Sequence, residues 1–193
     1  MPFGVQLLFA CILNNDIQRA EECLQQLLPI IKKNNEKWLR DIAILLNGVV
    51  LIEKGRMSQG FEMVKEIEQT SFRCHRKGVL PFFWYALGKI YLEIIQQTKP
   101  ISILTILKNI GFIIKNVPTA YKKAIYWYSK SIEMAEEIGA TNMKAQALLD
   151  LGIIYRIKKQ NDKAKKSLET AIEIFEEVGA YAFLKQAKQE LDP

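Results

Sequence analysis

Two neighbouring residues, Cys74 and His75, are the first candidates for chemistry in this sequence. They lie in SFRCHRKG, and His75 is the only histidine of the chain. A thiolate and an imidazole could bind a metal ion or form a nucleophile–base pair. Adjacent residues on a helix point about 100° apart, so the two side chains do not converge, and no third ligand is evident. We therefore interpret His75 as a helix-end residue whose neighbours Arg73, Arg76 and Lys77 complement the helix dipole.

Paired glutamates occur twice, as Glu136-Glu137 and Glu176-Glu177. Two carboxylates can perform acid–base catalysis together. Both pairs stand at the same position of an internal repeat, however, and this recurrence indicates a solvent-exposed helix face. The sequence also contains no P-loop and no GxGxxG, HExxH or GxSxG motif. We therefore predict that this region has no catalytic residue, no cofactor and no metal, and that on its own it is not an enzyme.

Aromatic residues and an excess of positive charge raise the question of nucleic-acid binding. The aromatic cluster consists of Trp84, Tyr85, Tyr121, Tyr126, Trp127 and Tyr128. Several of them fall on positions of the repeat core, so we assign them to packing between helices rather than to base stacking. The net charge of +6 comes from one window, since six lysines and no acidic residue lie between Glu93 and Glu133. A nucleic-acid binder would be basic more uniformly, and we predict no nucleic-acid partner.

The composition fits a folded protein of a reducing compartment. The chain has 193 residues, 49% of them hydrophobic and 25% charged, which suits one compact domain or a short repeat array. Three cysteines without CxxC spacing argue against a disulfide framework and favour the cytoplasm. The apolar start MPFGVQLLFACIL lacks the basic residues and the cleavage site of a signal peptide, so we interpret it as a packing helix. Whether the chain is a piece of a longer protein stays open.

The sequence repeats itself with a period of forty residues. KKAIYWYSKSIEMAEEIGA (122–140) aligns without gaps to DKAKKSLETAIEIFEEVGA (162–180). WYALGKIY (84–91) aligns with LLDLGIIY (148–155) at an offset of sixty-four, so twenty-four residues are inserted between the two matched blocks. The forty-residue spacing also separates three earlier positions, Leu8, Gly48 and Gly88. Repeats of this length indicate stacked supersecondary units.

Each repeat is predicted to be a pair of helices. Apolar residues recur at i, i+3, i+4 and i+7, as in Leu148, Leu151 and Tyr155, and no alternating stretch competes. Asn161 suits an N-cap, and Gly139 and Gly179 suit the left-handed residue that ends a helix. The expected pairs are 4–14 with 17–35, 37–55 with 57–74, 79–97 with 119–138, and 141–159 with 161–178. A last helix, 180–191, would cap the stack.

Small and aromatic residues at these spacings resemble the tetratricopeptide repeat, whose two helices carry Trp-x2-Leu-Gly-x2-Tyr and Ala-x3-Phe-x2-Ala. The first motif is complete at Trp84, Leu87, Gly88 and Tyr91. The last repeat keeps most of both motifs at Leu151, Gly152, Tyr155, Ala164, Leu168 and Ala171, with Leu148 in place of the Trp and Leu168 in place of the Phe. The first two repeats are degenerate.

The resemblance implies an all-α, tetratricopeptide-like α–α superhelix of about four helix pairs. It would form a single domain over residues 1–193. The expected repeats are about 1–36, 37–76, 77–140 with an insert at 95–118, and 141–179, followed by the cap helix at 180–191.

A narrower resemblance concerns the insert together with the ending AIEIFEEVGAYAFLKQAKQEL. Both are similar to the C-terminal tetratricopeptide region of bacterial class III adenylate/guanylate cyclase–ATPase signalling proteins. This resemblance implies a cytoplasmic, non-catalytic region with a regulatory or scaffolding role. It implies protein partners, namely other domains of the parent chain, a second subunit or a helical peptide. No cyclase metal-binding or nucleotide-binding motif lies inside these residues.

Some tetratricopeptide domains bind peptide carboxylates with polar residues of their first helices. The corresponding groove-lining positions here are Val5, Phe9, Ile12, Leu45, Val49, Ile52, Tyr85, Lys89 and Leu92. Because almost all of them are apolar, we expect no carboxylate clamp and instead a groove that accepts an apolar helix. An alternative function is a ligand- or peptide-sensing domain with an apolar concave pocket.

The inserted segment KPISILTILKNIGFIIKNVP (99–118) could supply such a helix. Pro100 suits its first turn and Pro118 its end. The spacing of its apolar residues predicts an amphipathic helix of about four turns. The apolar stripe consists of Ile103, Ile106, Leu107, Ile110, Ile113, Ile114 and Val117, and Thr105, Lys108, Asn109, Lys115 and Asn116 lie away from it.

Three interpretations of this helix are open. It could fold back into the groove of its own array, because an exposed stripe of this size would favour aggregation. It could instead bind another subunit or another domain of the parent protein. It could also contact a membrane, with its lysines facing anionic headgroups. Gly111 and the two asparagines weaken this last interpretation, and we do not expect membrane binding.

Overall fold

The computed structural model of the chain describes residues 16–34, 37–73, 78, 80–96 and 108–192. Within these ranges the regular structure is helical and no residue forms a strand, so the predicted all-α fold class is confirmed. The expected helix at 4–14 lies outside the described residues, as do Cys74 and His75.

The helices follow the predicted order, and their ends agree with the predicted ends to within two residues. They are α2 (Ile17–Asn34), α3 (Lys37–Glu53), α4 (Met57–Arg73), α5 (Leu80–Gln96), α7 (Ile110–Asn116), the 3₁₀ turn η2 (Val117–Thr119), α8 (Ala120–Glu137), α9 (Thr141–Ile157), α10 (Asn161–Glu177) and α11 (Tyr181–Leu191). The exception is the predicted helix of the insert, within which the structure describes only α7 and the residues just before and after it.

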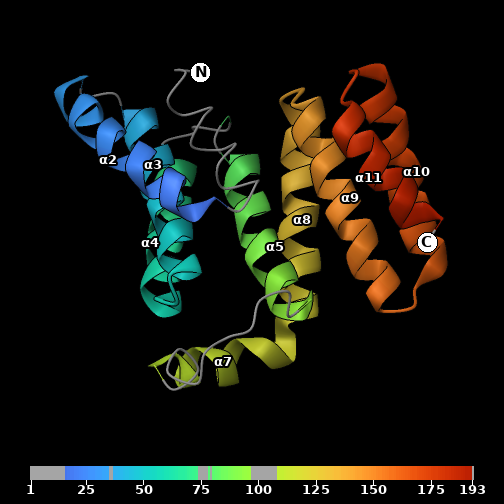
Figure 1. The fold of residues 1–193 in the computed structure, drawn as a ribbon, viewed down its shortest axis with the longest axis horizontal. Helices are drawn as coiled ribbons and strands as arrows, with labels where there is room; N and C mark the ends of the chain where they lie inside the picture. Colours follow the sequence, from blue (N-terminus) through green and yellow to red (C-terminus); the bar gives the residue numbers. More distant parts are fainter. Residues whose placement is uncertain (1–15, 35–36, 74–77, 79, 97–107, 193) are drawn as a thin grey trace. The chain divides into compact units, whose positions relative to one another are not determined.

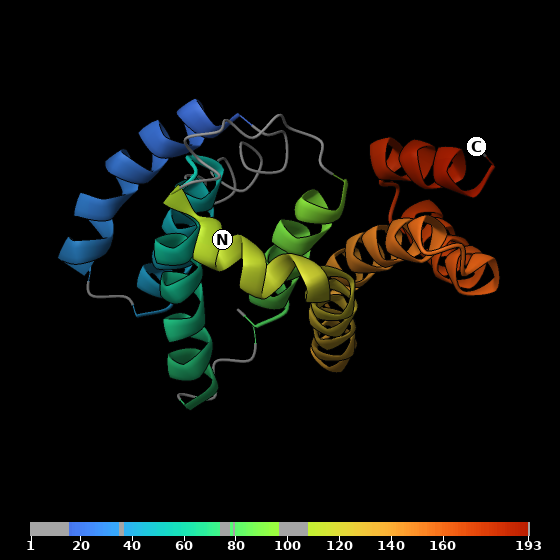
Figure 2. The same ribbon diagram turned by 90° about the horizontal axis from the view of Figure 1, so that it is seen from below.

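The chain divides into two compact units. Unit 1 comprises residues Met1–Val79 and Pro100–Lys115, and unit 2 comprises Leu80–Lys99 and Asn116–Pro193. In unit 1, α2 packs on α3, and α3 packs on α4 (Figure 1). In unit 2, α5 packs on α8, α8 on α9, and α9 on α10, while α11 lies against α9 and α10 (Figure 2). A single domain over the whole chain stays a prediction.

In unit 1, α3 and α4 approach each other closely at two glycines. A Cβ added to Gly48 would lie 2.7 Å from Val64 Cγ2 and 2.9 Å from the carbonyl oxygen of Gly60, and one added to Gly60 would collide with the carbonyl oxygen of Gly48. The two backbones therefore touch where both side chains are absent. A second cluster packs α2 on α3 through Ala20, Leu24, Ile31, Ile42, Ala43, Leu46 and Val50.

In unit 2, the residues of the predicted repeat motifs form the core. Trp84, Leu87 and Tyr91 of α5 are at most 5% exposed, and Ala164, Leu168 and Ala171 of α10 are at most 4% exposed. Gly88 lies against the ring of Tyr128, where an added Cβ would be 2.8 Å from Cε1. Gly152 lies in the same way against Leu168. These small residues let each first helix approach its partner closely.

The helix ends confirm one prediction and correct another. Gly139 and Gly179 both have φ of +70°, as expected for the left-handed residue that ends a helix. Asn161, however, is the first residue of α10 rather than its N-cap, which is Gln160 without a side-chain hydrogen bond. Asp162 supplies a negative charge in the first turn of α10, where it complements the helix dipole.

Candidate interaction surface

The described part of the insert consists of α7 and η2, which lead directly into α8. The first turn of α7 is closed by the amide of Ile113, which donates to the carbonyl oxygen of Asn109 at 2.9 Å. Pro118 lies within η2, after the end of α7. The unit boundary falls between Lys115 and Asn116, so nearly all of α7 belongs to unit 1. Whether the helix extends back toward Pro100 stays a prediction.

One side of α7 contacts unit 1 through Asn109 and Phe112. Asn109, just before the helix, is 5% exposed. Its Nδ2 donates to the carbonyl oxygen of Gly55 at 2.6 Å, and its Oδ1 accepts a hydrogen bond from the amide of Met57 at 3.1 Å. The ring of Phe112 packs edge-on against Phe61 of α4, with centroids 5.3 Å apart. The insert thus contacts the turn between α3 and α4 and the helix that follows it.

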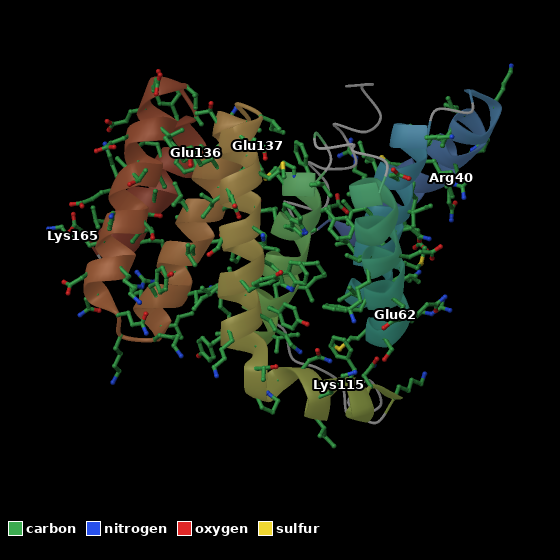
Figure 3. The ribbon with its side chains drawn as sticks, turned by 180° about the vertical axis from the view of Figure 1, so that it is seen from behind. Arg40, Glu62, Lys115, Glu136, Glu137 and Lys165 are labelled. Atoms are coloured by element: carbon green, nitrogen blue, oxygen red, sulfur yellow. The ribbon has the colours of Figure 1, made fainter. Side chains whose placement is uncertain are left out.

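The other side of α7 faces solvent. Lys108, Gly111, Ile114 and Lys115 are exposed and, at helical spacing, share one side. Ile114 is 68% exposed. Figure 3 shows Lys115 projecting away from α7. No described residue forms an ion pair with either lysine. We call Lys108, Gly111, Ile114 and Lys115 the outer face of α7.

The residues of the apolar stripe predicted for the insert do not share one degree of burial. Ile103, Ile106 and Leu107 lie outside the described residues, and Ile110 lies in α7 although its side chain is not described. Ile113 is half-buried, whereas Ile114 is exposed and Val117 is 45% exposed. Asn109 and Asn116, which the sequence put away from the stripe, are the buried residues. Whether the stripe fills a groove or binds a partner stays open for the residues outside the described ranges.

The end of α7 makes its contacts in unit 2 through Asn116, which is 7% exposed. Its Oδ1 accepts hydrogen bonds from the Tyr91 hydroxyl at 3.2 Å and from Lys123 Nζ at 2.8 Å. The same ammonium lies 5.5 Å from the centroid of the Tyr91 ring, a cation–π contact. Burial raises the pKa of Tyr91, so its hydroxyl remains a donor at neutral pH.

Of the predicted groove positions, Val5, Phe9 and Ile12 lie outside the described residues, and the described apolar positions offer little side-chain surface. Val49 and Ile52 on α3 are each 8% exposed, and so is Tyr85 on α5. Lys89, also on α5, has a side chain that is 38% exposed. The prediction that these residues bind a partner or a groove-filling helix stays untested for each of them.

Tyr85 and Lys89 belong to a polar cluster around Asp150 of α9, which is 3% exposed. The Tyr128 hydroxyl of α8 donates to Asp150 Oδ2 at 2.9 Å, and Lys89 Nζ lies 3.4 Å from the same oxygen. The rings of Tyr85 and Tyr128 meet edge-on, with centroids 5.7 Å apart. Burial, and then the negative charge of Asp150, raise the pKa of both tyrosines. Both hydroxyls therefore keep their protons, and the cluster joins α5, α8 and α9.

Sequence reasoning missed Asp150, Tyr128 and the two asparagines as polar anchors. The available signal for Asp150 was a lone carboxylate inside the apolar run AQALLDLGII. A buried carboxylate requires a cation or several donors nearby, and the helix periodicity alone does not tell which side chains supply them.

The two glutamate pairs lie on solvent-exposed helix faces. Glu136 and Glu137 lie exposed on α8 (Figure 3), and Glu176 and Glu177 are exposed on α10, as predicted. Glu136 pairs with Lys144 at 2.9 Å, and Glu176 pairs with Lys188 at 2.8 Å. Among the residues that the structure describes, no group of three or more histidine, cysteine, aspartate or glutamate side chains could hold a metal ion.

A shallow pocket lies along α11 and is lined by Tyr181, Leu184, Lys185, Lys188, Gln189 and Asp192. None of the predicted groove positions lines it, so it lends no support to an apolar concave ligand site. No helix within the described ranges has the length and apolar character needed to span a membrane.

Comparisons with known proteins find a family match in the C-terminal half of the chain. The family model described as tetratricopeptide repeat matches residues 103–177, which include α7 to α10. The crystal structure of the apo form of RapI is similar, with 16% sequence identity and a TM-score of 0.39, over 98% of this chain and 57% of that chain. The present chain thus spans little more than half the length of RapI. A comparison with curated proteins found no match.

Proposed function

We propose that this tetratricopeptide repeat chain is a non-catalytic protein-interaction module and that the outer face of α7 is a binding surface. The exposed Ile114 supports this proposal most directly, because it is 68% exposed and shares its side of the helix with two lysines that form no ion pair with a described residue. It lies on a segment inserted into a repeat that otherwise buries its motif residues. The insert is therefore the part of this repeat whose side chains are available to bind a partner protein.

The charge of the outer face indicates the chemistry of its partner. Lys108 and Lys115 share the outer face with Ile114, and no acidic residue occurs between Glu93 and Glu133. Long-range attraction would thus favour an acidic protein segment. The apolar stems of the lysines extend the contact area around Ile114. The partner that fits best is an acidic amphipathic helix, which would set an apolar side chain on Ile114 and carboxylates near the two ammonium groups.

We further propose that the chain is the regulatory region of a bacterial cytoplasmic signalling protein with cyclase and ATPase domains. The resemblance of the insert and of the C-terminal ending to such proteins supports this assignment. In that setting, the acidic segment would belong to the parent chain or to a second subunit. A longer reading frame without a catalytic domain upstream would contradict the parentage and leave the interaction role intact.

Site-specific photo-crosslinking tests the surface. A benzophenone amino acid replaces Ile114, or, as the control, Tyr181 of α11, which is 77% exposed. In cells that make the protein, we expect a distinct crosslinked protein at Ile114 only. Calorimetry with that purified protein should then show at least tenfold weaker binding for Ile114→Asp, equal to about 1.4 kcal/mol, and unchanged binding for Tyr181→Asp.

Two outcomes would contradict the proposal. Identical crosslinks at both positions would show no preference for the outer face. Sedimentation of the protein with anionic phosphatidylserine vesicles that Lys115→Glu abolishes would instead support membrane binding.

A further inference from the structure

Helix α4 begins at a residue that its own sequence cannot cap. The first amides of a helix have no partner within the helix, and a preceding Ser, Thr, Asp or Asn side chain usually supplies one. Here Arg56 precedes Met57, and arginine has no side-chain acceptor. The amide of Gly60 bonds to the carbonyl oxygen of Arg56 at 3.0 Å, so the regular ladder begins there. The acceptor for the Met57 amide is Asn109 Oδ1, from a residue 52 positions along the chain.

The same side chain also holds the preceding turn. Asn109 Nδ2 donates to the carbonyl oxygen of Gly55 at 2.6 Å. Gly55 has φ of +77° and is the left-handed residue of the turn between α3 and α4. One amide group thus satisfies an acceptor and a donor two residues apart. Aspartate would keep the acceptor for Met57 but lose the donor to Gly55, and alanine would lose both.

An apolar contact accompanies the two hydrogen bonds. Phe112 follows Asn109 by three residues and therefore lies on the same side of α7. Its ring meets Phe61, which is 4% exposed and lies in the second turn of α4. A cap joined to an apolar contact one turn away is the combination that fixes helix starts within a continuous chain. In this protein, both parts come from the insert.

We propose that the insert is a strap, in which Asn109 caps α4 from outside that helix and thereby fixes the turn between α3 and α4. The strap is independent of the proposed binding surface, since Asn109 and Phe112 are not residues of the outer face. Its loss should release the start of α4 while the packing of α2 on α3 persists.

Amide hydrogen exchange measured by NMR tests the strap. In Asn109→Ala we expect exchange at Met57 and Gly60 to accelerate at least tenfold, with Leu46 and Val50 of α3 unchanged. The matched control is Asn116→Ala, which removes the other buried asparagine of the insert. It should leave Met57 and Gly60 unchanged, because its partners Tyr91 and Lys123 lie in unit 2.

A double-mutant cycle separates the cap from general loosening. Met57→Pro removes the donated N–H at the first helical position, where proline is tolerated. If the cap exists, Asn109→Ala and Met57→Pro together should accelerate Gly60 exchange no more than the larger single change. Additive effects, or unchanged exchange in Asn109→Ala, would overturn the proposal. If Asn109→Ala does not fold, Asn109→Asp is measured instead. Because aspartate keeps the acceptor, the Met57 amide should stay protected from exchange in this variant. A loss of protection at Met57 as large as that at Gly60 would also overturn the proposal.

Discussion

Replacement of Gly60 by alanine should destabilise unit 1, because α3 and α4 touch backbone to backbone at this position. The added Cβ would collide with the carbonyl oxygen of Gly48 and lie 2.7 Å from Ile52 Cγ1 and 3.1 Å from the Ile52 amide nitrogen. Two of these three atoms belong to the backbone of α3, so rotamer changes cannot relieve the contact. The helices must move apart, and the apolar contacts on either side of the crossing must loosen.

The magnitude follows from two opposing effects. Overpacking of a core typically costs about 1–3 kcal/mol, and a backbone collision belongs at the upper end of that range. Alanine in a helix interior is about 1 kcal/mol more favourable than glycine. The net loss in the free energy of unfolding should thus be about 2 kcal/mol. For a chain of this length, such a loss lowers the melting temperature by about 4–8 °C.

Urea denaturation followed by far-UV circular dichroism measures the loss. Gly111→Ala is the matched control, since Gly111 also lies in a helix but its added Cβ would meet no atom of a neighbouring segment within 4 Å. This variant should be as stable as the parent or up to about 1 kcal/mol more stable. If Gly60→Ala proved as stable as Gly111→Ala, the close approach of α3 and α4 would be refuted.

Two further predictions concern unit 2. Gly88→Ala should lower the free energy of unfolding by about 1–3 kcal/mol, and by more than Gly152→Ala. The Cβ at 88 meets the rigid ring of Tyr128, whereas the Cβ at 152 meets the Leu168 side chain, which can change rotamer. Equal losses in parallel urea titrations would contradict this order. Tyr128→Phe should cost about 1.5–3 kcal/mol at pH 7, the usual range for a hydrogen bond to a charged group. This cost should shrink as pH rises above about 10, since the raised pKa of Tyr128 means that the folded state keeps a proton that the unfolded chain releases there. The parent should thus lose up to about 1.4 kcal/mol per pH unit relative to the variant, and a constant difference from pH 9 to 11 would show that Tyr128 is not protected from titration.

The helix pairs could be predicted from the sequence because they depend on local pattern. Apolar spacing, the glycines at 139 and 179 and the forty-residue period each report on neighbours a few residues away. Trp84, Gly88 and Tyr91 were assigned to the core from the same pattern, and the structure buries them. The N-cap at Asn161 was wrong by one residue, because a polar residue at the start of a helix can equally be its first helical position.

The polar contacts of the insert could not be predicted in the same way. Periodicity set Asn109 and Asn116 on a polar side, and an amphipathic helix usually exposes that side. Asn109 is buried because Gly55 and Met57, more than fifty residues earlier, present an acceptor and a donor to it. Asp150 is buried for an equivalent reason, beside Lys89 and Tyr128. Contacts at such sequence separation depend on the folded arrangement, which a local pattern does not encode.

The position of the insert inside a helix pair has a consequence for chain entropy. Helices α5 and α8 are joined by residues 97–119, which number 23, whereas α9 and α10 are joined by the three residues 158–160. For a flexible chain, closing a loop of 23 residues costs about 2 kcal/mol more than closing one of three, from (3/2)RT ln(23/3), and the helical turns of α7 and η2 reduce this difference. The hydrogen bonds of Asn116 to Tyr91 and Lys123 anchor the loop beside α8 and oppose that cost. The pairing of α5 with α8 is thus the one in unit 2 whose stability depends on how well its connection is ordered.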